Sequence, residues 1–180
     1  MIDDIPRWNL GVLRTPQIGN GGTGAIYRIT QRHVAKILLD AYLDRFQEAD
    51  APATRRGMSI QQLAWEHSIA VHLREHGVNA VRTYGVYDIP IRTGPFGIGR
   101  ITVLPGLLME YVTGDPVDHL PVVIRHRATE LLEKELGNAR ALGYEPSWSA
   151  QQPEGNALYD RDLDSVTLLD FAFWDERRRP

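Results

Sequence analysis

Six residues near the N-terminus, Gly19-Asn20-Gly21-Gly22-Thr23-Gly24, constrain this chain more than any other feature. Their G-x-G-x-x-G spacing occurs in different phosphate-binding loops, so the spacing alone decides little. A Rossmann loop runs from a strand into a helix, whose N-terminus meets the pyrophosphate. Here the following segment alternates with period two and contains β-branched Ile26 and Ile29, which predicts a strand and disfavours a Rossmann loop. A Walker A loop is excluded, because Ala25-Ile26 replaces its Lys-Ser/Thr.

A third phosphate-binding arrangement is a glycine-rich β-hairpin that lies over ATP with its backbone N–H groups facing the phosphates. It has an apolar β-branched residue two positions after the last glycine and a lysine on a following V-A-x-K strand. Ile26 fits the first condition, and Val34-Ala35-Lys36 resembles the second. Lysine occurs only at Lys36 and Lys134 beside 18 arginines, so composition alone does not account for a lysine at this buried-looking position. A glycine-bulged hairpin that binds nothing remains the alternative.

Composition limits the class of protein. The 180 residues are 43% hydrophobic and 24% charged, which is typical of one soluble domain. A net charge of −3 gives no bulk basicity for nucleic acid or an anionic membrane. The absence of cysteine excludes disulfides, a thiolate zinc site and a cysteine nucleophile. No apolar run approaches the roughly 20 residues of a membrane helix, and the N-terminus lacks the pattern of a Sec-type signal, so we expect a cytoplasmic protein.

Hydrophobic periodicity predicts an α+β chain whose N-terminal half is rich in strands. Ser59 with Gln62 fits a capping box that starts a helix, Gly77 ends this helix, and Pro52 and Gly57 indicate a loop over 50–57. A further break falls at 114–116, and 143–155 is expected to be irregular. The predicted strands cover 10–13, 25–30, 33–38, 81–89, 101–111, 157–159 and 166–169, and the predicted helices cover 38–49, 59–76 and 122–142.

Several segments in this order resemble the protein kinase superfamily over nearly the whole chain. After the glycine loop and Lys36, the run from Glu66 through Tyr87 is similar to the kinase αC helix and the strand that follows it. The resemblance implies that Lys36 contacts the ATP phosphates and that Glu66 pairs with it. It also implies a nucleotide site that includes the glycine loop and its neighbours, namely Ile18, Gly19, Asn20, Gly21, Gly22, Thr23, Gly24, Ile26 and Ala35.

Two later segments extend the resemblance. Leu108-Met109-Glu110-Tyr111-Val112-Thr113-Gly114 is similar to the interlobe hinge, which implies adenine binding by Met109, Glu110 and Val112, with Met109 at the gatekeeper position. Asn156 and Asp170, the latter in Asp170-Phe171-Ala172 where Asp-Phe-Gly is usual, are expected to bind Mg²⁺ through hard oxygen atoms. The implied fold is one bilobal domain: an antiparallel β-sheet N-lobe with an αC-type helix (1–108), a hinge (109–114) and a reduced, mostly helical C-lobe (115–180).

Two departures from the kinase pattern stand out. Kinases place an aspartate five residues before the asparagine, to accept the proton of the substrate hydroxyl, and here that position is Gln151. Glutamine can orient a hydroxyl but takes no proton; Glu154 and Glu145 are nearby carboxylates that could replace the base. The chain also ends ten residues after Asp170, without an activation loop or a peptide-binding floor. It thus resembles minimal kinases of some bacterial pathogens and mobile elements, including secreted effectors, or it is part of a longer protein.

The leading hypothesis is therefore an ATP- and Mg²⁺-binding minimal kinase that transfers a phosphoryl group to a protein hydroxyl, in the cytoplasm or, for an effector, in a host cytosol. The alternatives are a pseudokinase that binds a protein partner, favoured by Gln151, and transfer of another group such as AMP. His72 and His76 with Glu75 match the H-x-x-E-H zinc protease pattern, but no third-ligand motif follows. Arg177–Arg179 is expected to be a solvated tail. No nucleic acid or membrane partner is expected, and the oligomeric state is left open.

Overall fold

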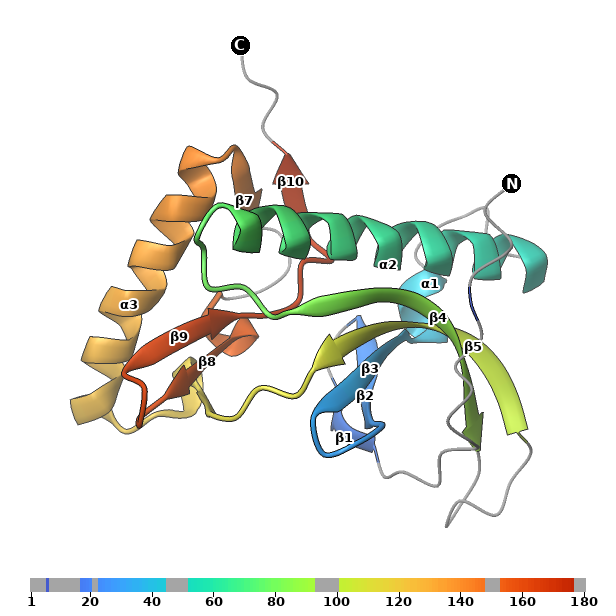
Figure 1. The fold of residues 1–180 in the computed structure, drawn as a ribbon, viewed down its shortest axis with the longest axis horizontal. Helices are drawn as coiled ribbons and strands as arrows, with labels where there is room; N and C mark the ends of the chain where they lie inside the picture. Colours follow the sequence, from blue (N-terminus) through green and yellow to red (C-terminus); the bar gives the residue numbers. More distant parts are fainter. Residues whose placement is uncertain are drawn as a thin grey trace. The chain divides into compact units, whose positions relative to one another are not determined.

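A computed structural model describes residues 6, 17–20, 23–44, 52–92, 101–147 and 153–176 (Figure 1). The chain divides into two compact units: residues 1–67 with 83–111, and residues 68–82 with 112–180. The chain crosses between the units after His67, after Arg82 and after Tyr111, and the last crossing lies within the segment 109–114 that the sequence predicts as a hinge. Residues 68–82 belong to the second unit, although the sequence assigned them to the first lobe.

The first unit is built on an antiparallel five-stranded sheet with the strand order β1-β2-β3-β5-β4. Its strands are β1 (Gln17–Asn20), β2 (Gly24–Arg28), β3 (His33–Leu38), β4 (Thr83–Arg92) and β5 (Ile101–Glu110). Buried residues of β3, β4 and β5 and of the β2–β3 turn form the core of the sheet, because apolar side chains recur along these strands: Ile29, Ala35, Ile37, Ile89, Ile91 and Leu108. Four predicted strands are thus confirmed to within a few residues, and the strand predicted at 10–13 lies outside the described residues.

Two helices of the chain's first half differ from the prediction. α1 covers Asp40–Leu43 of the helix predicted over 38–49. Leu38 ends β3, Leu39 and Asp44 are not helical, and residues 45–49 lie outside the described residues. α2 covers Pro52–Glu75, so the predicted loop over 50–57 and the predicted start at Ser59 are wrong. Proline is tolerated in the first turn of a helix, where its missing N–H has no intrahelical partner, and one interior glycine costs only about 1 kcal/mol.

Tertiary ion pairs explain why α2 begins early. Arg55 lies 2.6 Å from Asp44, and Arg56 lies 2.8 Å from Asp88 of β4, so the first turns of the helix are stabilised by partners distant in sequence. The hydroxyl of Ser59 donates to the carbonyl of Arg55 at 2.9 Å, as in a helix interior, and does not cap the N-terminus. The predicted end is confirmed: Gly77 follows the helix with φ of +83°.

The second unit combines one long helix with short strands. The helix α3 covers Val122–Ala141 and buries the stripe Ala128, Leu132, Leu136 and Ala139. One small antiparallel sheet has the order β6-β8-β9, and another pairs β7 with β10. The elements of these sheets are β6 (Asp115–Pro116), β7 (Tyr144–Pro146), β8 (Ala157–Asp160), β9 (Ser165–Leu168) and β10 (Trp174–Glu176), with short 3-10 turns η2 (Val117–His119) and η3 (Pro153–Asn156).

The predicted helix over 122–142 and the strands near 157–159 and 166–169 are therefore confirmed, whereas β7 and η3 lie in the stretch predicted to be irregular. Asn79, which follows α2, is hydrogen-bonded to both α3 and β9. Its N–H donates to Glu135 of α3 at 3.0 Å, and its carbonyl accepts from the N–H of Leu168 of β9 at 2.8 Å. Within the described part of the chain, no helix is long and apolar enough to cross a membrane.

Candidate functional site

Lys36 and Glu66 form a buried ion pair in the first unit. Lys36 lies on β3 opposite Ile26 of β2 and Leu107 of β5, and Glu66 lies on α2. The distance from Lys36 Nζ to Glu66 Oε2 is 2.8 Å, and the two side chains are only 3% and 1% exposed. Desolvating two charges costs several kcal/mol per ion, so each one depends on the other.

The glycine motif forms the β1–β2 hairpin next to this pair. Gly19 lies opposite Ile26, and Asn20 lies opposite Ala25, while Gly21 and Gly22 are outside the described residues. A Cβ at Gly24 would lie 2.8 Å from the carbonyl oxygen of Ile37 and 3.1 Å from side-chain carbons of Lys36. The last glycine of the motif is therefore needed for β2 to lie close to β3 beside the lysine.

The remaining predicted nucleotide contacts of the first unit lie near this hairpin or at the end of β5. The carbonyl of the buried Thr23 accepts from the N–H of Leu39 at 3.0 Å, and Ile18 is partly exposed. Ala35 is fully buried opposite Leu108, and Met109 and Glu110 follow on β5 opposite Val34 and His33.

The segment after β5 is held by β2 and the β2–β3 turn. The N–H of Tyr111 donates to the carbonyl of Arg32 at 2.8 Å, and the guanidinium of Arg28 lies 4.0 Å from the centre of the Tyr111 ring. Val112, the first residue of the second unit here, is half-buried. A hinge function for this segment stays a prediction.

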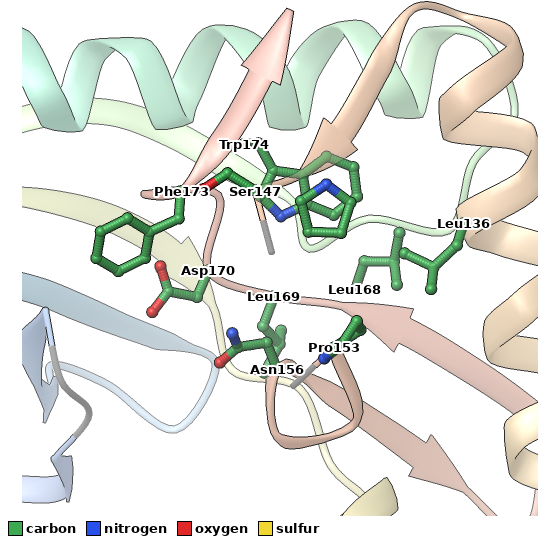
Figure 2. Close-up of a pocket in the computed structure, with 10 residues that line it drawn as sticks. Leu136, Ser147, Pro153, Asn156, Leu168, Leu169, Asp170, Phe173 and Trp174 are labelled. Atoms are coloured by element: carbon green, nitrogen blue, oxygen red, sulfur yellow. The ribbon is translucent and has the colours of Figure 1, made fainter. Parts of the chain in front are cut away.

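The second unit brings Asn156 and Asp170 together. Ala157 of β8 pairs with Leu168 of β9, and the N–H of Leu169 donates to the carbonyl of Asn156 at 2.8 Å. The hairpin register therefore places the residue before β8 next to the residues after β9. Both side chains line one pocket and point to the same side of it in Figure 2. The other lining residues are Leu136, Pro146, Ser147, Pro153, Leu168, Leu169, Phe173 and Trp174.

The backbone of Asp170 is in the left-handed region, with φ of +49°. Such a conformation is uncommon for any residue other than glycine, and it recurs at functional sites, where the surrounding structure enforces it. The N–H of Ala172 donates to Oδ1 of Asp170 at 3.2 Å, and Phe171 beside it is 1% exposed. The carboxylate of Asp170 is thus held by local hydrogen bonding and by a buried neighbour.

An ion network at the far end of the β8–β9 hairpin was not predicted. Arg127 of α3 donates three hydrogen bonds to Asp164, at 2.7, 3.2 and 3.3 Å, and the hydroxyl of Tyr159 donates to Asp164 at 2.9 Å. Hydrogen bonds from Arg127, followed by that from Tyr159, hold the pKa of the Asp164 carboxyl below its usual range. The network fixes the hairpin that carries Asn156 and Asp170, and the sequence gives no signal that pairs residues 37 positions apart.

The residues considered for a zinc site, for the catalytic base and for the C-terminal tail are different from the pairs described above. His72 and His76 stack with ring centres 4.2 Å apart, but no group of three or more His, Cys, Asp or Glu residues that could hold a metal occurs within the described residues. Glu154 of η3 and Glu145 of β7 are half-buried, the latter opposite Asp175. Gln151 and Arg177–Arg179 lie outside the described residues.

The sequence matches no family model and no curated protein. Among solved structures, it is similar to a Stt7 homologue from Micromonas algae soaked with ATP, at a TM-score of 0.60 and 15% identity over 94% of this chain and 53% of that one. It is also similar to WbdD bound to the kinase inhibitor LY294002, at a TM-score of 0.51 and 13% identity over 92% of this chain and 34% of that one.

Monomeric WbdD gives a TM-score of 0.52 at 12% identity, with 86% of this chain and 33% of that chain covered. The chain thus spans about half the length of the Stt7 homologue and about a third of the WbdD chains. At these identities the similarity concerns the fold alone. Together with the sheet, helices and hairpins described above, it shows that the chain has a protein kinase-like fold.

Proposed function

We propose that this chain binds ATP with Mg²⁺ and transfers a phosphoryl group to a protein hydroxyl. The buried ion pair between Lys36 and Glu66 carries the proposal. A well-packed apolar pair of similar volume is often as stable as a buried ion pair or more stable, so folding gives no reason to retain these charges. Positioning the α- and β-phosphates does give one, because a lysine held by a helix glutamate is the arrangement that kinases use.

Asn156 and Asp170 fit a Mg²⁺ site. Mg²⁺ favours oxygen ligands and is usually held by one or two protein groups together with substrate phosphates and water. An amide oxygen and a carboxylate that line one pocket provide such a donor set. The ion would supply charge neutralisation at the phosphates, and the protein would supply the rigid placement of the two side chains through the hairpin register.

The rest of the nucleotide site follows from the glycine hairpin and the segment after β5. Residues 19–24 would cover the phosphates with backbone N–H groups, and the backbone of Glu110 and Val112 beside Met109 would contact the adenine. The ATP soak of the Micromonas Stt7 homologue and the inhibitor bound to WbdD support a nucleotide site on this fold.

Glutamine at position 151 predicts slow transfer. General base catalysis contributes about 10²–10⁴-fold to the rate, whereas positioning and electrostatic stabilisation carry most of phosphoryl transfer. The same residue supports a second candidate function, a pseudokinase that uses bound nucleotide to engage a protein partner. Transfer of AMP is a third outcome, and the mass of the modified product distinguishes it from phosphorylation.

Thermal unfolding with ATP, with and without Mg²⁺, tests the nucleotide site. ATP at 100 times its Kd stabilises the native state by about 2.7 kcal/mol, and we expect a Mg²⁺-dependent rise in Tm. The rise is lost in Lys36→Ala and in Asp170→Ala. Lys134→Ala, which removes the other lysine from an exposed position on α3, and Asp162→Asn, at the exposed hairpin tip, retain it. A wild-type protein that shows no shift at millimolar ATP contradicts the proposal.

A further inference from the structure

The helix that carries Glu66 is tied to β4 at two points. Nη2 of Arg56 donates to Oδ2 of Asp88 at 3.0 Å and lies 2.8 Å from its Oδ1. Eleven residues later on the helix, Nδ1 of His67 shares a hydrogen bond of 2.7 Å with Oγ1 of Thr83. The first part of α2 runs along β4 in the opposite direction, so the earlier helix residue meets the later strand residue (Figure 1). We call these two contacts the β4 tethers.

The spacing of the four residues places the β4 tethers on matching faces. Arg56 and His67 are about three helical turns apart, so they lie on one face of α2, about 16 Å from each other. Thr83 and Asp88 have an odd spacing, which in a regular strand would send their side chains to opposite faces. A register shift between Thr83 and Gly85, where Gly85 has φ of +115°, adds one residue and returns both side chains to the same face.

The same face of the sheet carries Lys36. Thr83 and Asp88 lie opposite β5 residues that are four positions apart. Lys36 lies opposite Leu107, which is halfway between those two residues. Because side chains alternate along a strand, Lys36, Thr83 and Asp88 all face the side of the sheet that α2 covers. Glu66 directly precedes the second tether on the helix, and a rotation of α2 by one residue position, about 100°, would carry its carboxylate away from the lysine.

Both tethers are partly shielded from water. The side chains of Arg56 and Asp88 are 31% and 21% exposed, whereas those of the pair Arg161–Asp115 are 53% and 57% exposed. Burial lowers the pKa of His67 from its ordinary value of 6.5, so the ring is neutral at neutral pH and adds no charge to this part of the helix. The first tether is therefore an ion pair with reduced solvation, and the second is a neutral hydrogen bond.

We propose that Arg56 and His67 are positioning residues, which hold α2 so that Glu66 meets Lys36 before any nucleotide binds. In protein kinases this lysine–glutamate pair must be in place for transfer, and the position of the helix decides whether it forms. Both tethers lie in the same unit as the pair, so this unit itself supplies the contacts that keep the pair formed. The phosphate site would then be preorganised and need no helix movement on binding. The inference deepens the proposed function and rests on it only for the consequence for ATP.

Lys36 can be observed directly, because the sequence contains only one other lysine. In Lys134→Arg protein labelled with heavy nitrogen in lysine, NMR reports the ammonium of Lys36 alone. A buried, ion-paired ammonium exchanges its protons with water slowly, and we expect this protection in the protein without nucleotide. Arg56→Met and Thr83→Val each remove one tether, and exchange should become about tenfold faster as the population with an open pair rises.

Matched variants separate the β4 tethers from general fraying of the helix. Arg55→Met removes ion pairs at α1 that do not involve β4, and Thr83→Ser keeps the hydroxyl, so both should exchange like the wild type. The reversed pair, Arg56→Glu with Asp88→Arg, should restore the wild-type rate. Thr83→Val tests the second tether without altering any charge.

The affinity for ATP gives a second readout. The Kd measured by calorimetry with Mg²⁺ should be about tenfold weaker in Arg56→Met than in Arg55→Met, because affinity falls with the fraction of the protein in the competent state. A variant that had only lost stability would bind ATP normally below its Tm.

The outcomes separate the two proposals. An unprotected Lys36 in the wild type, or a wild-type exchange rate in either Arg56→Met or Thr83→Val, overturns the positioning role even if ATP and Mg²⁺ stabilise the protein. Equally fast exchange in Arg55→Met also overturns it, because fraying of the first helical turns would then explain the result. Faster exchange in the two tether variants alone, reversed by the swapped pair, supports it. If that result is obtained and the wild type does not bind ATP, the tethers stand and the proposed function fails.

Discussion

The buried pair Lys36–Glu66 permits a sharp test of whether it serves stability or function. Both side chains are at most 3% exposed, and 2.8 Å separates Nζ from Oε2. Replacing one partner, in Lys36→Met or Glu66→Leu, leaves the other charge buried and uncompensated. Such a loss destabilises a protein by about 3–5 kcal/mol. In a chain of this length, 1 kcal/mol shifts Tm by about 2–4 °C, so each single variant should melt about 6–20 °C below wild type.

The double variant should recover most of this loss. With both charges replaced by apolar groups of similar volume, no charge remains to be desolvated, and stability returns to that of wild type or exceeds it by about 1–4 kcal/mol. Urea titration followed by circular dichroism gives the four free energies of unfolding and their coupling energy. The control cycle uses the exposed pair Arg161–Asp115, in which both side chains are more than half exposed, and its coupling should be at most about 1 kcal/mol.

The same set of Lys36 and Glu66 variants also distinguishes a role in ATP binding from a role in stability. The double variant, although stable, should show no Mg²⁺-dependent shift with ATP, because Lys36 would be the group that contacts the phosphates. Single variants within 1 kcal/mol of wild type would refute the claim that these charges are desolvated together. A double variant destabilised by the sum of the two singles would refute the coupling. An ATP shift retained in the double variant would refute the role of Lys36.

Three further variants test other parts of the structure. Hydrogen bonds from Arg127 depress the pKa of Asp164 from its ordinary value of 3.8. This group therefore stabilises the folded protein above pH 3.8, and the stabilisation is lost as the pH falls through the lower pKa of the folded state. Below pH 3.8 the Tm of Asp164→Asn should fall less steeply than that of wild type. Gly114→Ala should lower the free energy of unfolding by about 1–3 kcal/mol in urea titration, because φ there is +139° and the new Cβ would lie 2.8 Å from the carbonyl oxygen of Tyr159. Gln151→Asp should raise phosphoryl transfer by up to about 10²-fold in a radiolabel assay, and an unchanged rate would count against the proposed register of the catalytic loop.

Local patterns account for what the sequence predicted well. Apolar residues alternate with period two in β2, β3 and β5, and they recur at helical spacing over 122–142, which forms α3. One buried face of a strand or helix produces such a pattern in residues that are close in sequence. The early start of α2 has no local signal: Pro52 and Gly57 indicate a loop, and the helix forms there because Arg55 and Arg56 find carboxylates on other elements. Propensity is overridden by tertiary contacts at this point.

The candidate site also contains residues that the sequence pattern indicates and features that only the tertiary structure shows. Lys36, Glu66, Asn156 and Asp170 stand in the sequence in the order that the kinase resemblance requires, and the structure brings them together in two pairs, one in each unit. The buried Oδ1 of Asp118, which has no hydrogen-bond partner within the described residues, gives no such signal, because its lack of a partner is a property of the three-dimensional structure. Properties defined by what a residue lacks in three dimensions cannot be obtained from spacing.

Two features beside the proposed ligands oppose stability, one in each unit. The ion pair on β3 and α2 is desolvated, and Asp170 has a left-handed backbone. A left-handed residue other than glycine costs on the order of 1–3 kcal/mol, a large fraction of the net stability of a domain. Substitutions that remove such costs are common, so folding alone does not require either feature. Under the proposed function, phosphates beside Lys36 and Mg²⁺ beside Asp170 would each compensate a charge that is costly in the unliganded protein, and for that reason the two features favour ligand binding over a purely structural role.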